Sequence, residues 1–229
     1  MPDNELRQLR FTPPEGATQI ILVRHGESAP HVPGRPFALV DGHGDPHLSE
    51  LGRWQAERVG ERLAAEDVSA IYVSTLTRTH QTAAPLAQRL GLTPQVEPDL
   101  REVHLGEWEG GVYREKAAED HPAFRQMQLE QRWDAIPGAE SNESLTRRTV
   151  AVIERIHQRH PDELVTVVAH GGVIGAILAH AAESRPFAFN GADNGSLHHL
   201  VLTEQRWILR RYNDTGHLAS ISALASPPI

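Results

Sequence analysis

The sequence predicts an α/β protein, a three-layer α/β/α sandwich around a mostly parallel central sheet. Two observations lead to this prediction. Short apolar segments typical of buried strands alternate along the chain with longer segments of helical periodicity, and strands joined by helices form parallel sheets covered on both faces. The chain has 229 residues, of which 39% are hydrophobic. We therefore expect a single domain over residues 1–229, with a polar amino-terminal arm at about 1–17.

The first half of the chain contains two strand and helix pairs. Residues 18–23 form the first strand, because the apolar run "IILV" suits a strand buried on both faces. After a long loop to residue 47, Ser49 is the expected N-cap of a helix over residues 49–66. A second strand is expected at 69–74 and a second helix at 77–90, which Gly91 should end. The first helix presents four apolar positions on one face, namely Leu51, Ala56, Val59 and Leu63.

The second half repeats this alternation after an irregular stretch. Residues 101–138 contain a turn around "HLGEWEGG" and then one or two polar helices. The clearest helix lies within 140–163, where apolar residues recur at helical spacing. A third buried strand, "LVTVVA", begins at residue 164 and a helix follows over 173–181. Residues 195–213 alternate like an antiparallel strand pair on a sheet edge.

Composition limits the classes of partner. The formal net charge of -8 argues against a nucleic acid or an anionic membrane, which would need clustered Lys and Arg. Without cysteine, the chain can form no disulfide, thiolate nucleophile or Cys-ligated metal site. The start of the chain lacks the pattern of a secretory signal, and histidine and glycine interrupt the apolar stretch 164–182. We expect a cytoplasmic protein with a small-molecule partner, and the sequence leaves homodimer formation open.

Two of the predicted strands end alike, the first in "VRHG" and the third in "VAHG". If these strands are neighbours in a parallel sheet, His25 and His170 emerge side by side, with the strands about 4.8 Å apart. The glycine after each histidine would let backbone N–H groups and the helix end approach an anion. Arg24 adjoins the first histidine, and Arg78 lies in the first turn of a helix, where a positive charge is unfavourable unless an anion is near. These residues form a positive cup suited to a phosphoryl group.

The cup needs an acid, and the stretch "DLREVHLGEWEG" offers Glu102, Glu107 and Glu109. Beside a dianionic ligand the ionised form of a carboxyl is disfavoured, so such a group can hold the proton that a leaving oxygen requires. The residues alone do not separate the three candidates.

The loop "DGHGDPH" superficially resembles a metal site, with Asp41, His43, Asp45 and His47 at alternate positions. Alternation in a loop rich in Gly and Pro fixes no ligand geometry, so we favour a solvated loop and expect no metal. A lid over the site is the other role open to this loop.

These segments together resemble the histidine phosphatase superfamily, also called the phosphoglycerate mutase-like family. "LVRHGES" resembles the signature around its nucleophilic histidine, "STLTRTHQTA" its second arginine motif, "LREVHLGEWEG" its acid motif and "VVAHGGVI" its second histidine. "GAESNESL" and "YNDTGHL" also resemble stretches common in the family. Four motifs in the right order, each in the expected strand context, make the resemblance specific.

The resemblance implies the roles of the site residues. His25 would be the nucleophile that takes the phosphoryl group, and Arg24, Arg78 and His170 would bind its oxygens. Glu102, directly after "LR", would protonate the leaving group. The implied enzyme is a phosphomonoester hydrolase that acts on a small phosphorylated metabolite through a phosphohistidine, with no metal or other cofactor. Further substrate-binding residues would be Ser28, His31 and Gly171.

Two other functions stay open at this point. A cofactor-dependent phosphoglycerate mutase is disfavoured by His31, where the mutase branch commonly has asparagine, and by the short segment from Glu102 to Glu140. A non-catalytic phosphate-binding protein would need neither a nucleophile nor an acid. The extra length of this chain lies between Ser28 and Leu48, in a loop that we expect to shape the substrate entrance.

Overall fold

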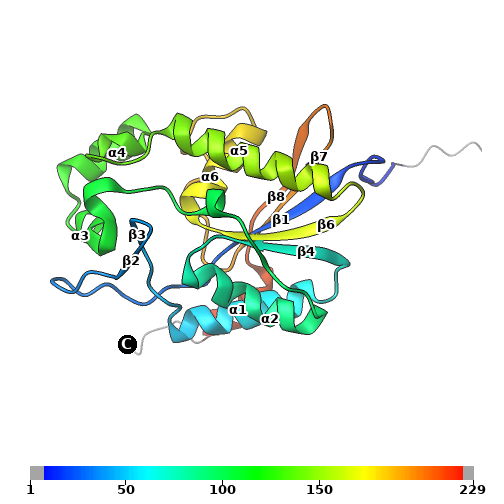
Figure 1. Cartoon of the computed structure of the whole chain (residues 1–229), viewed down its shortest axis with the longest axis horizontal. Coiled ribbons are helices and arrows are strands. Elements are labelled where there is room, and N and C mark those ends of the chain that lie inside the picture. Colours follow the sequence, from blue (N-terminus) through cyan, green and yellow to red (C-terminus); the bar gives the residue numbers. More distant parts are fainter. Residues whose placement is uncertain (1–7, 224–229) are drawn as a thin grey trace, which may run out of the picture.

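The fold is built on one six-stranded sheet with helices on both faces (Figure 1), as the computed structural model of residues 8–223 shows. The strand order is β5-β4-β6-β1-β7-β8. Four neighbouring strands, β5, β4, β6 and β1, are parallel, whereas β7 pairs antiparallel with both β1 and β8. This arrangement confirms the predicted α/β sandwich. The bounds are β1 Thr18–Arg24, β4 Val68–Val73, β5 Gln95–Val96, β6 Leu164–Ala169, β7 Leu197–Leu202 and β8 Trp207–Asp214.

The helices form the outer layers. Helices α1 (Glu50–Leu63) and α2 (Thr77–Leu90) cover one face of the sheet, and α5 (Asn142–Arg159) and α6 (Gly171–Ala181) cover the other. Two short helices, α3 (Val112–Ala118) and α4 (Pro122–Glu130), lie at one end of the molecule near a small hairpin of β2 (Leu39–Val40) and β3 (His43–Gly44) (Figure 1). Short 3-10 helices cover Pro98–Leu100, Gly106–Gly111, Trp133–Ala135 and Gly216–Ala223.

Strand β1 divides the hydrophobic core in two, because alternate side chains of a strand point to opposite faces of the sheet. Ile20 and Leu22 are fully buried in the core beneath α5 and α6, whereas Val23 belongs to the core beneath α1 and α2. Burial on both faces explains the uninterrupted apolar run of this strand.

The capping predictions are confirmed. Ser49 caps α1, since its Oγ accepts a hydrogen bond of 3.0 Å from the Gly52 N–H. Helix α2 has the predicted bounds, and Gly91 follows it with a φ of 67°, in the left-handed region where glycine is favoured. Helix α6 begins at Gly171, two residues before the predicted start.

The prediction for Leu51 is wrong, because its side chain is 39% exposed. The buried stripe of α1 passes through Gly52, Ala56, Val59 and Leu63 instead. Gly52 lies on the stripe because the backbone of the site loop presses on it: a Cβ there would lie 1.9 Å from the Glu27 carbonyl oxygen. Periodicity alone could not reveal a buried position that has no side chain.

The amino-terminal arm and the apolar stretch 164–182 were also singled out in the sequence. Residues 8–14 of the expected arm have no helix or strand, and its first seven residues lie outside the described part. The stretch 164–182 divides into β6 and α6. Between residues 8 and 223, none of the helices combines the length and apolar character needed to cross a membrane.

Candidate active site

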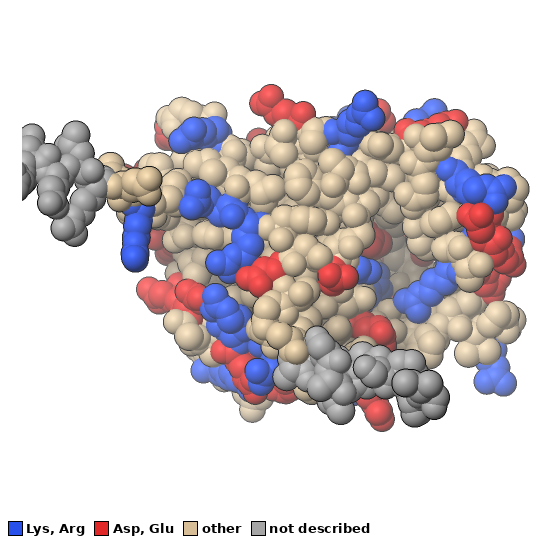
Figure 2. All heavy atoms as spheres, turned by 180° about the vertical axis from the view of Figure 1, so that it is seen from behind, with Lys and Arg blue, Asp and Glu red and all other residues tan. Residues whose placement is uncertain are grey.

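The candidate site is a cavity of about 820 Å³ at the carboxyl ends of the parallel strands. Figure 2 shows a hollow in the surface, with Lys and Arg atoms in and around it. The predicted residues Arg24, His25, Arg78 and Glu102 line this cavity, together with the loop 37–46 and helix α3. Segments far apart in the sequence therefore meet where ligands of open α/β sheets usually bind.

The register of β1 and β6 brings the two histidines together. Arg24 pairs with Ala169, so His25 and His170 are the next residues of two neighbouring parallel strands. The His25 N–H extends the ladder with a hydrogen bond of 3.0 Å to the Ala169 carbonyl. The centroids of the two imidazole rings are 5.2 Å apart.

The hydrogen bonds of His25 define its tautomer. Its Nδ1 lies 2.7 Å from the Gly26 carbonyl oxygen, which can only accept, so Nδ1 carries the hydrogen. Its Nε2 faces the Arg78 Nε–H at 3.2 Å and therefore accepts with its lone pair. Burial, and then the charges of Arg78 and Arg24, hold the pKa of His25 well below its usual value. A neutral imidazole with the lone pair on Nε2 is the form that can act as a nucleophile.

His170 is fully buried behind this cavity rather than part of its open wall. Its Nε2 contacts the Ser74 Oγ at 2.9 Å, and its Nδ1 has no hydrogen-bond partner among the described residues. Burial and the Arg78 charge lower the pKa of His170 well below its usual value, so the ring is neutral. Sequence reasoning missed Ser74, which fixes the orientation of this ring.

Backbone carbonyls hold both predicted arginines, of which Arg78 is buried and Arg24 is partly buried. Arg24 donates from Nη1 to the Ala192 carbonyl, and its buried Nε has no partner among the described residues. Arg78 donates from Nη1 to the Gly44 carbonyl at 2.9 Å. Burial lowers the pKa of each guanidinium from its usual value. The positive cup expected from the sequence is therefore present and largely desolvated.

Glu102 lies at the amino-terminal end of α6. Its Oε1 accepts hydrogen bonds from the Val103 N–H at 2.9 Å and the Gly172 N–H at 3.1 Å. Its Oε2 has only a 3.3 Å contact with the same Gly172 N–H. A Cβ at Gly172 would lie 2.7 Å from Oε1, so the second glycine of "HGG" makes room for this carboxyl.

A partly buried ion pair holds the backbone of Glu102. The guanidinium of Arg148 donates to the carbonyls of Asp99, Arg101 and Glu102, at 2.6, 2.7 and 3.0 Å. It also pairs with the Glu140 carboxylate at 2.8 Å. Arg148 lies inside the predicted helix without any motif, so its sequence context gave no signal of this role.

The other two acid candidates are placed differently. Glu107 is exposed and does not line the cavity. Glu109 lines the cavity, but each of its oxygens accepts a hydrogen bond of 2.8 Å from a backbone N–H, one from Gly44 and one from Leu105. Glu109 therefore ties the entrance loop to the acid segment.

The glycine after His25 has a different purpose from the one expected. The Gly26 N–H donates to the Thr82 Oγ1 at 3.0 Å and is not free for an anion. A Cβ at Gly26 would lie 2.3 Å from the Gly52 carbonyl oxygen, so glycine is needed for packing against α1. Gly171, by contrast, lines the cavity, and the atoms nearest to a Cβ there would be those of the Arg24 guanidinium, at ordinary contact distance.

Of the two remaining predicted binding residues, Ser28 and His31, only Ser28 lines the cavity. Ser28 lines the cavity, and its Oγ accepts a hydrogen bond of 2.7 Å from Arg114. His31 does not line the cavity: its Nε2 pairs with Glu115 at 2.7 Å, and its ring occupies space left by Gly111. The structure therefore corrects the expectation for His31, which supports helix α3 instead of facing a ligand.

The entrance loop lies against the site. Asp45 accepts from both the N–H and the Oγ1 of Thr77, at 2.8 and 2.6 Å, and its Oδ1 lies 3.8 Å from the Arg78 Nη1. It supplies the negative group expected at the start of α2. Asp41 pairs with Arg101 instead, at 3.1 Å. Across residues 8–223, no three His, Cys, Asp or Glu side chains are grouped as a metal ion would require.

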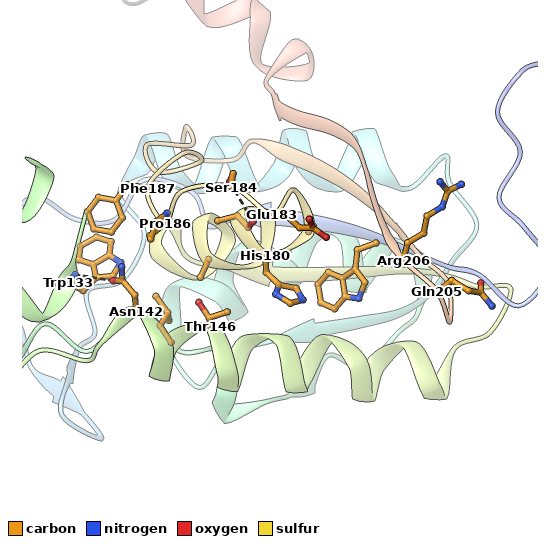
Figure 3. A pocket seen from close by; sticks show the side chains of 15 residues that line it. Trp133, Asn142, Thr146, His180, Glu183, Ser184, Pro186, Phe187, Gln205 and Arg206 are labelled. Carbon is orange, nitrogen blue, oxygen red and sulfur yellow. Dashed lines mark hydrogen bonds between the residues drawn. The ribbon is translucent and has the colours of Figure 1, made fainter. Parts of the chain in front are cut away.

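A second cavity, of about 470 Å³, lies between α5, α6 and the strand β8 (Figure 3). Trp133 lines both cavities, and the ring of His180 packs edge-on against Trp207 at 5.1 Å between centroids. Its charged lining residues are Glu183 and Arg206. It contains none of the predicted site residues.

Comparison with known proteins agrees with this geometry. A family model described as the histidine phosphatase superfamily (branch 1) matches residues 20–215. A metal-independent phosphoserine phosphatase of Arabidopsis thaliana is 34% identical over 210 residues, which cover 90% of this chain and 86% of that protein. A glucosyl-3-phosphoglycerate phosphatase of Mycobacterium tuberculosis (strain CDC 1551 / Oshkosh) is 34% identical over 171 residues, covering 71% and 74%. A solved structure of mycobacterial glucosyl-3-phosphoglycerate phosphatase with VO3 has a TM-score of 0.74 at 31% identity, covering 86% of this chain and 99% of that one.

The chain belongs to the histidine phosphatase superfamily, as its motifs predicted. The phosphatase relatives confirm the prediction of a histidine phosphatase that hydrolyses phosphomonoesters.

The geometry of His25 predicts an unusual titration. Between pH 8 and pH 6 its imidazole should stay neutral with the hydrogen on Nδ1, because the lowered pKa keeps the neutral form at a pH where an ordinary histidine is already charged. Nitrogen-15 NMR of the imidazole ring distinguishes both tautomers and the imidazolium. The chain unfolded in urea is the reference, since its histidines should titrate near pH 6.5. Protonation of His25 near that pH, or a hydrogen on Nε2, would contradict this geometry.

Proposed function

We propose that the enzyme hydrolyses a small phosphorylated metabolite through a phosphohistidine formed on His25. The observation that carries this proposal is the neutral His25 ring, whose Nε2 lone pair faces the buried guanidinium of Arg78 in a cavity that Arg24 and the Glu102 carboxyl also line. Binding alone would need the arginines but neither the fixed tautomer nor the carboxyl. This argues against the non-catalytic alternative.

In the first step Nε2 of His25 attacks phosphorus in line with the leaving oxygen. The Arg78 Nε–H now donates to Nε2, so the substrate must draw this donor onto a phosphoryl oxygen to free the lone pair. Arg24, whose side chain lines the cavity, can donate to another phosphoryl oxygen, and the neutral ring of His170 lies directly behind His25, with 5.2 Å between the ring centroids. As the Nε2–P bond forms and the P–O bond breaks, Glu102 gives its proton to the leaving oxygen. Its Oε2, which has the weaker backbone contact, is the oxygen suited to carry that proton.

In the second step water attacks the phosphohistidine. Glu102, now ionised, accepts the proton of the water as its oxygen bonds to phosphorus and the Nε2–P bond breaks. Phosphate leaves, and His25 returns to its neutral form. The guanidinium groups compensate the charge on the transferring phosphoryl group in a desolvated site, so the proposed steps use no metal ion.

Water is the proposed acceptor of the phosphoryl group because the cavity opens at the surface of the molecule (Figure 2). A mutase must exclude water from its phosphoenzyme until a second substrate hydroxyl attacks. The entrance loop, fixed to the site by Asp45 and Glu109, narrows the approach. The metal-independent relative that acts on phosphoserine supports a small substrate of this kind. A cytoplasmic location, the absence of nucleic-acid partners and a homodimer stay predictions from the sequence.

The role of Glu102 predicts a dependence on the leaving group. Glu102→Gln should lower the rate for alkyl phosphates by roughly 100-fold or more, and much less for p-nitrophenyl phosphate, whose leaving group needs little protonation. Steady-state rates on both substrates measure this ratio. Glu107→Gln is the matched control, because Glu107 is exposed outside the cavity. An equal loss on both substrates would assign Glu102 to binding or folding.

Hydrolysis and mutase activity differ in their products. With 3-phosphoglycerate, free phosphate should appear as fast as the monoester disappears, with little 2-phosphoglycerate even when the bisphosphate is supplied. Phosphate assay and NMR of the products follow both at once. Efficient interconversion of the phosphoglycerates with negligible release of phosphate would overturn the hydrolase and establish the mutase.

A further inference from the structure

The stretch "YNDTGHL" takes no part in the proposed chemistry, yet it lies against the site. It forms the end of β8 and the turn that follows, residues 212–218. Three of its side chains, those of Tyr212, Asn213 and His217, form hydrogen bonds with the segment 189–195, which comes before β7. Residues near the end of the described chain therefore support a loop that borders the site.

The loop 192–196 holds Arg24 at three points. The Ser196 carbonyl accepts from the Arg24 N–H at 3.1 Å, and the Gly195 N–H donates to the Arg24 carbonyl at 3.0 Å. The Ala192 carbonyl accepts from Nη1 of the guanidinium. Because the loop contacts both the backbone and the head group, the position of this guanidinium in the cavity depends on the conformation of the loop.

The side chain of Asn213 fixes the loop through Asp193. Its Oδ1 accepts from the Asp193 N–H at 2.7 Å, and its Nδ2 donates to the Asp193 Oδ2 at 2.8 Å. A backbone N–H needs an oxygen and a carboxylate needs an N–H, so both partners require the same orientation of the amide. The Asp193 carboxylate also attracts the charge of Arg24. One loop residue is thus held by its backbone and by its side chain.

The backbone of β8 is shaped to bring this amide to the loop. The register of β7 and β8 shifts, so that two residues of β8, Tyr212 and Asn213, lie opposite His198 alone. Asn213 has a φ of 51°, in the left-handed region that asparagine adopts more readily than most residues. Its N–H donates to Nδ1 of the buried His198 at 3.1 Å, so the hydrogen of that ring is on Nε2, which donates to the Ser196 Oγ at 3.0 Å. Burial and then the Arg24 charge lower the pKa of His198 to about 4, so at neutral pH the ring keeps both hydrogen bonds.

We propose that Asn213 is a positioning residue for the phosphoryl site, which holds the loop 192–196 so that the Arg24 guanidinium stays beside His25. This inference rests on the proposed hydrolase function, in which Arg24 binds the phosphoryl group. Asn213 does not line the cavity, so it acts through Arg24 and not by contact with the substrate. Among the described residues, the hydrogen bonds of its amide go to Asp193 alone. Loss of the amide should therefore move the loop and leave the sheet intact.

The first test removes the amide. Asn213→Gly keeps the left-handed backbone, which glycine adopts without strain. With p-nitrophenyl phosphate it should lower kcat/KM roughly 10- to 100-fold, the cost of a small displacement of a group that positions the substrate. In an Arg24→Lys background the same substitution should have almost no further effect, because the guanidinium that it displaces is gone. A residue that only stabilised the fold would lower both values by the same factor.

The second test exchanges the two partners. Asn213→Asp should lower kcat/KM at least as much as Asn213→Gly, because two carboxylates then face each other. Addition of Asp193→Asn should raise the value again about tenfold, since the donor and the acceptor are interchanged and the pair forms anew. This exchange also decides the matter if Asn213→Gly does not fold, because it restores both hydrogen bonds.

Glu183→Gly is the matched control. Glu183 has a similar φ of 49°, is exposed and lies outside the catalytic cavity, so its variant should keep the wild-type kcat/KM.

The outcomes separate this role from the hydrolase itself. If Asn213→Gly keeps the wild-type kcat/KM or lowers it equally in both backgrounds, or if the exchange restores nothing, the role of Asn213 is refuted while the hydrolase stands. If the wild type releases phosphate neither from p-nitrophenyl phosphate nor from a panel of phosphorylated metabolites, the hydrolase is refuted, and the role of Asn213 with it.

Discussion

The parallel pairing of β1 with β6 is the constraint on which the site depends. Because Arg24 pairs with Ala169, the next residue of each strand is a histidine, and the two histidines lie side by side at the sheet edge with ring centroids 5.2 Å apart. A shift of one residue would turn one of the two side chains to the other face of the sheet. The burial of Ile20, Leu22 and Val23 in two separate cores fixes that register. The residues that pack the core therefore also determine the geometry of the site.

Around this pair, electrostatics and hydrogen bonding keep the histidines reactive. Burial and the nearby guanidinium groups hold His25 and His170 neutral, while the carbonyl of Gly26 selects the tautomer of His25. Carboxylates attract these cations, Glu102 both Arg24 and Arg78, but among the described residues the nearest charge pair that either forms is that of Asp45 with Arg78 at 3.8 Å. A site of this kind suits a dianion, because the anion attracts guanidinium groups that otherwise repel one another. The Arg148 and Glu140 pair fixes the backbone of Glu102, the proposed acid.

The sequence predicted the parts of this site that lie on regular elements. Strand ends, the bounds of α2 and the Ser49 cap follow from local patterns of burial, glycine and capping, and the structure bears them out. Local patterns did not reveal Arg114 or Arg148, because each acts on a partner distant in the chain and neither belongs to a motif. The two wrong predictions, for Leu51 and His31, also concern contacts with segments distant in the chain. Leu51 was expected on the buried face of α1, and the sequence could not mark Gly52 as the buried position because glycine has no side chain. His31 was expected to face a ligand, and the sequence could not show its pairing with Glu115, which lies 84 positions away.

The central claim is that His25 carries the phosphoryl group between substrate and water. Rapid quenching of the enzyme with phosphorus-32-labelled substrate, followed by peptide mapping, tests it directly. The account predicts an acid-labile, base-stable phosphoprotein with the label on His25, absent from His25→Ala and present in His80→Ala, which removes an exposed histidine of α2 outside the cavity. A label on another residue, or equal labelling of His25→Ala, would contradict it.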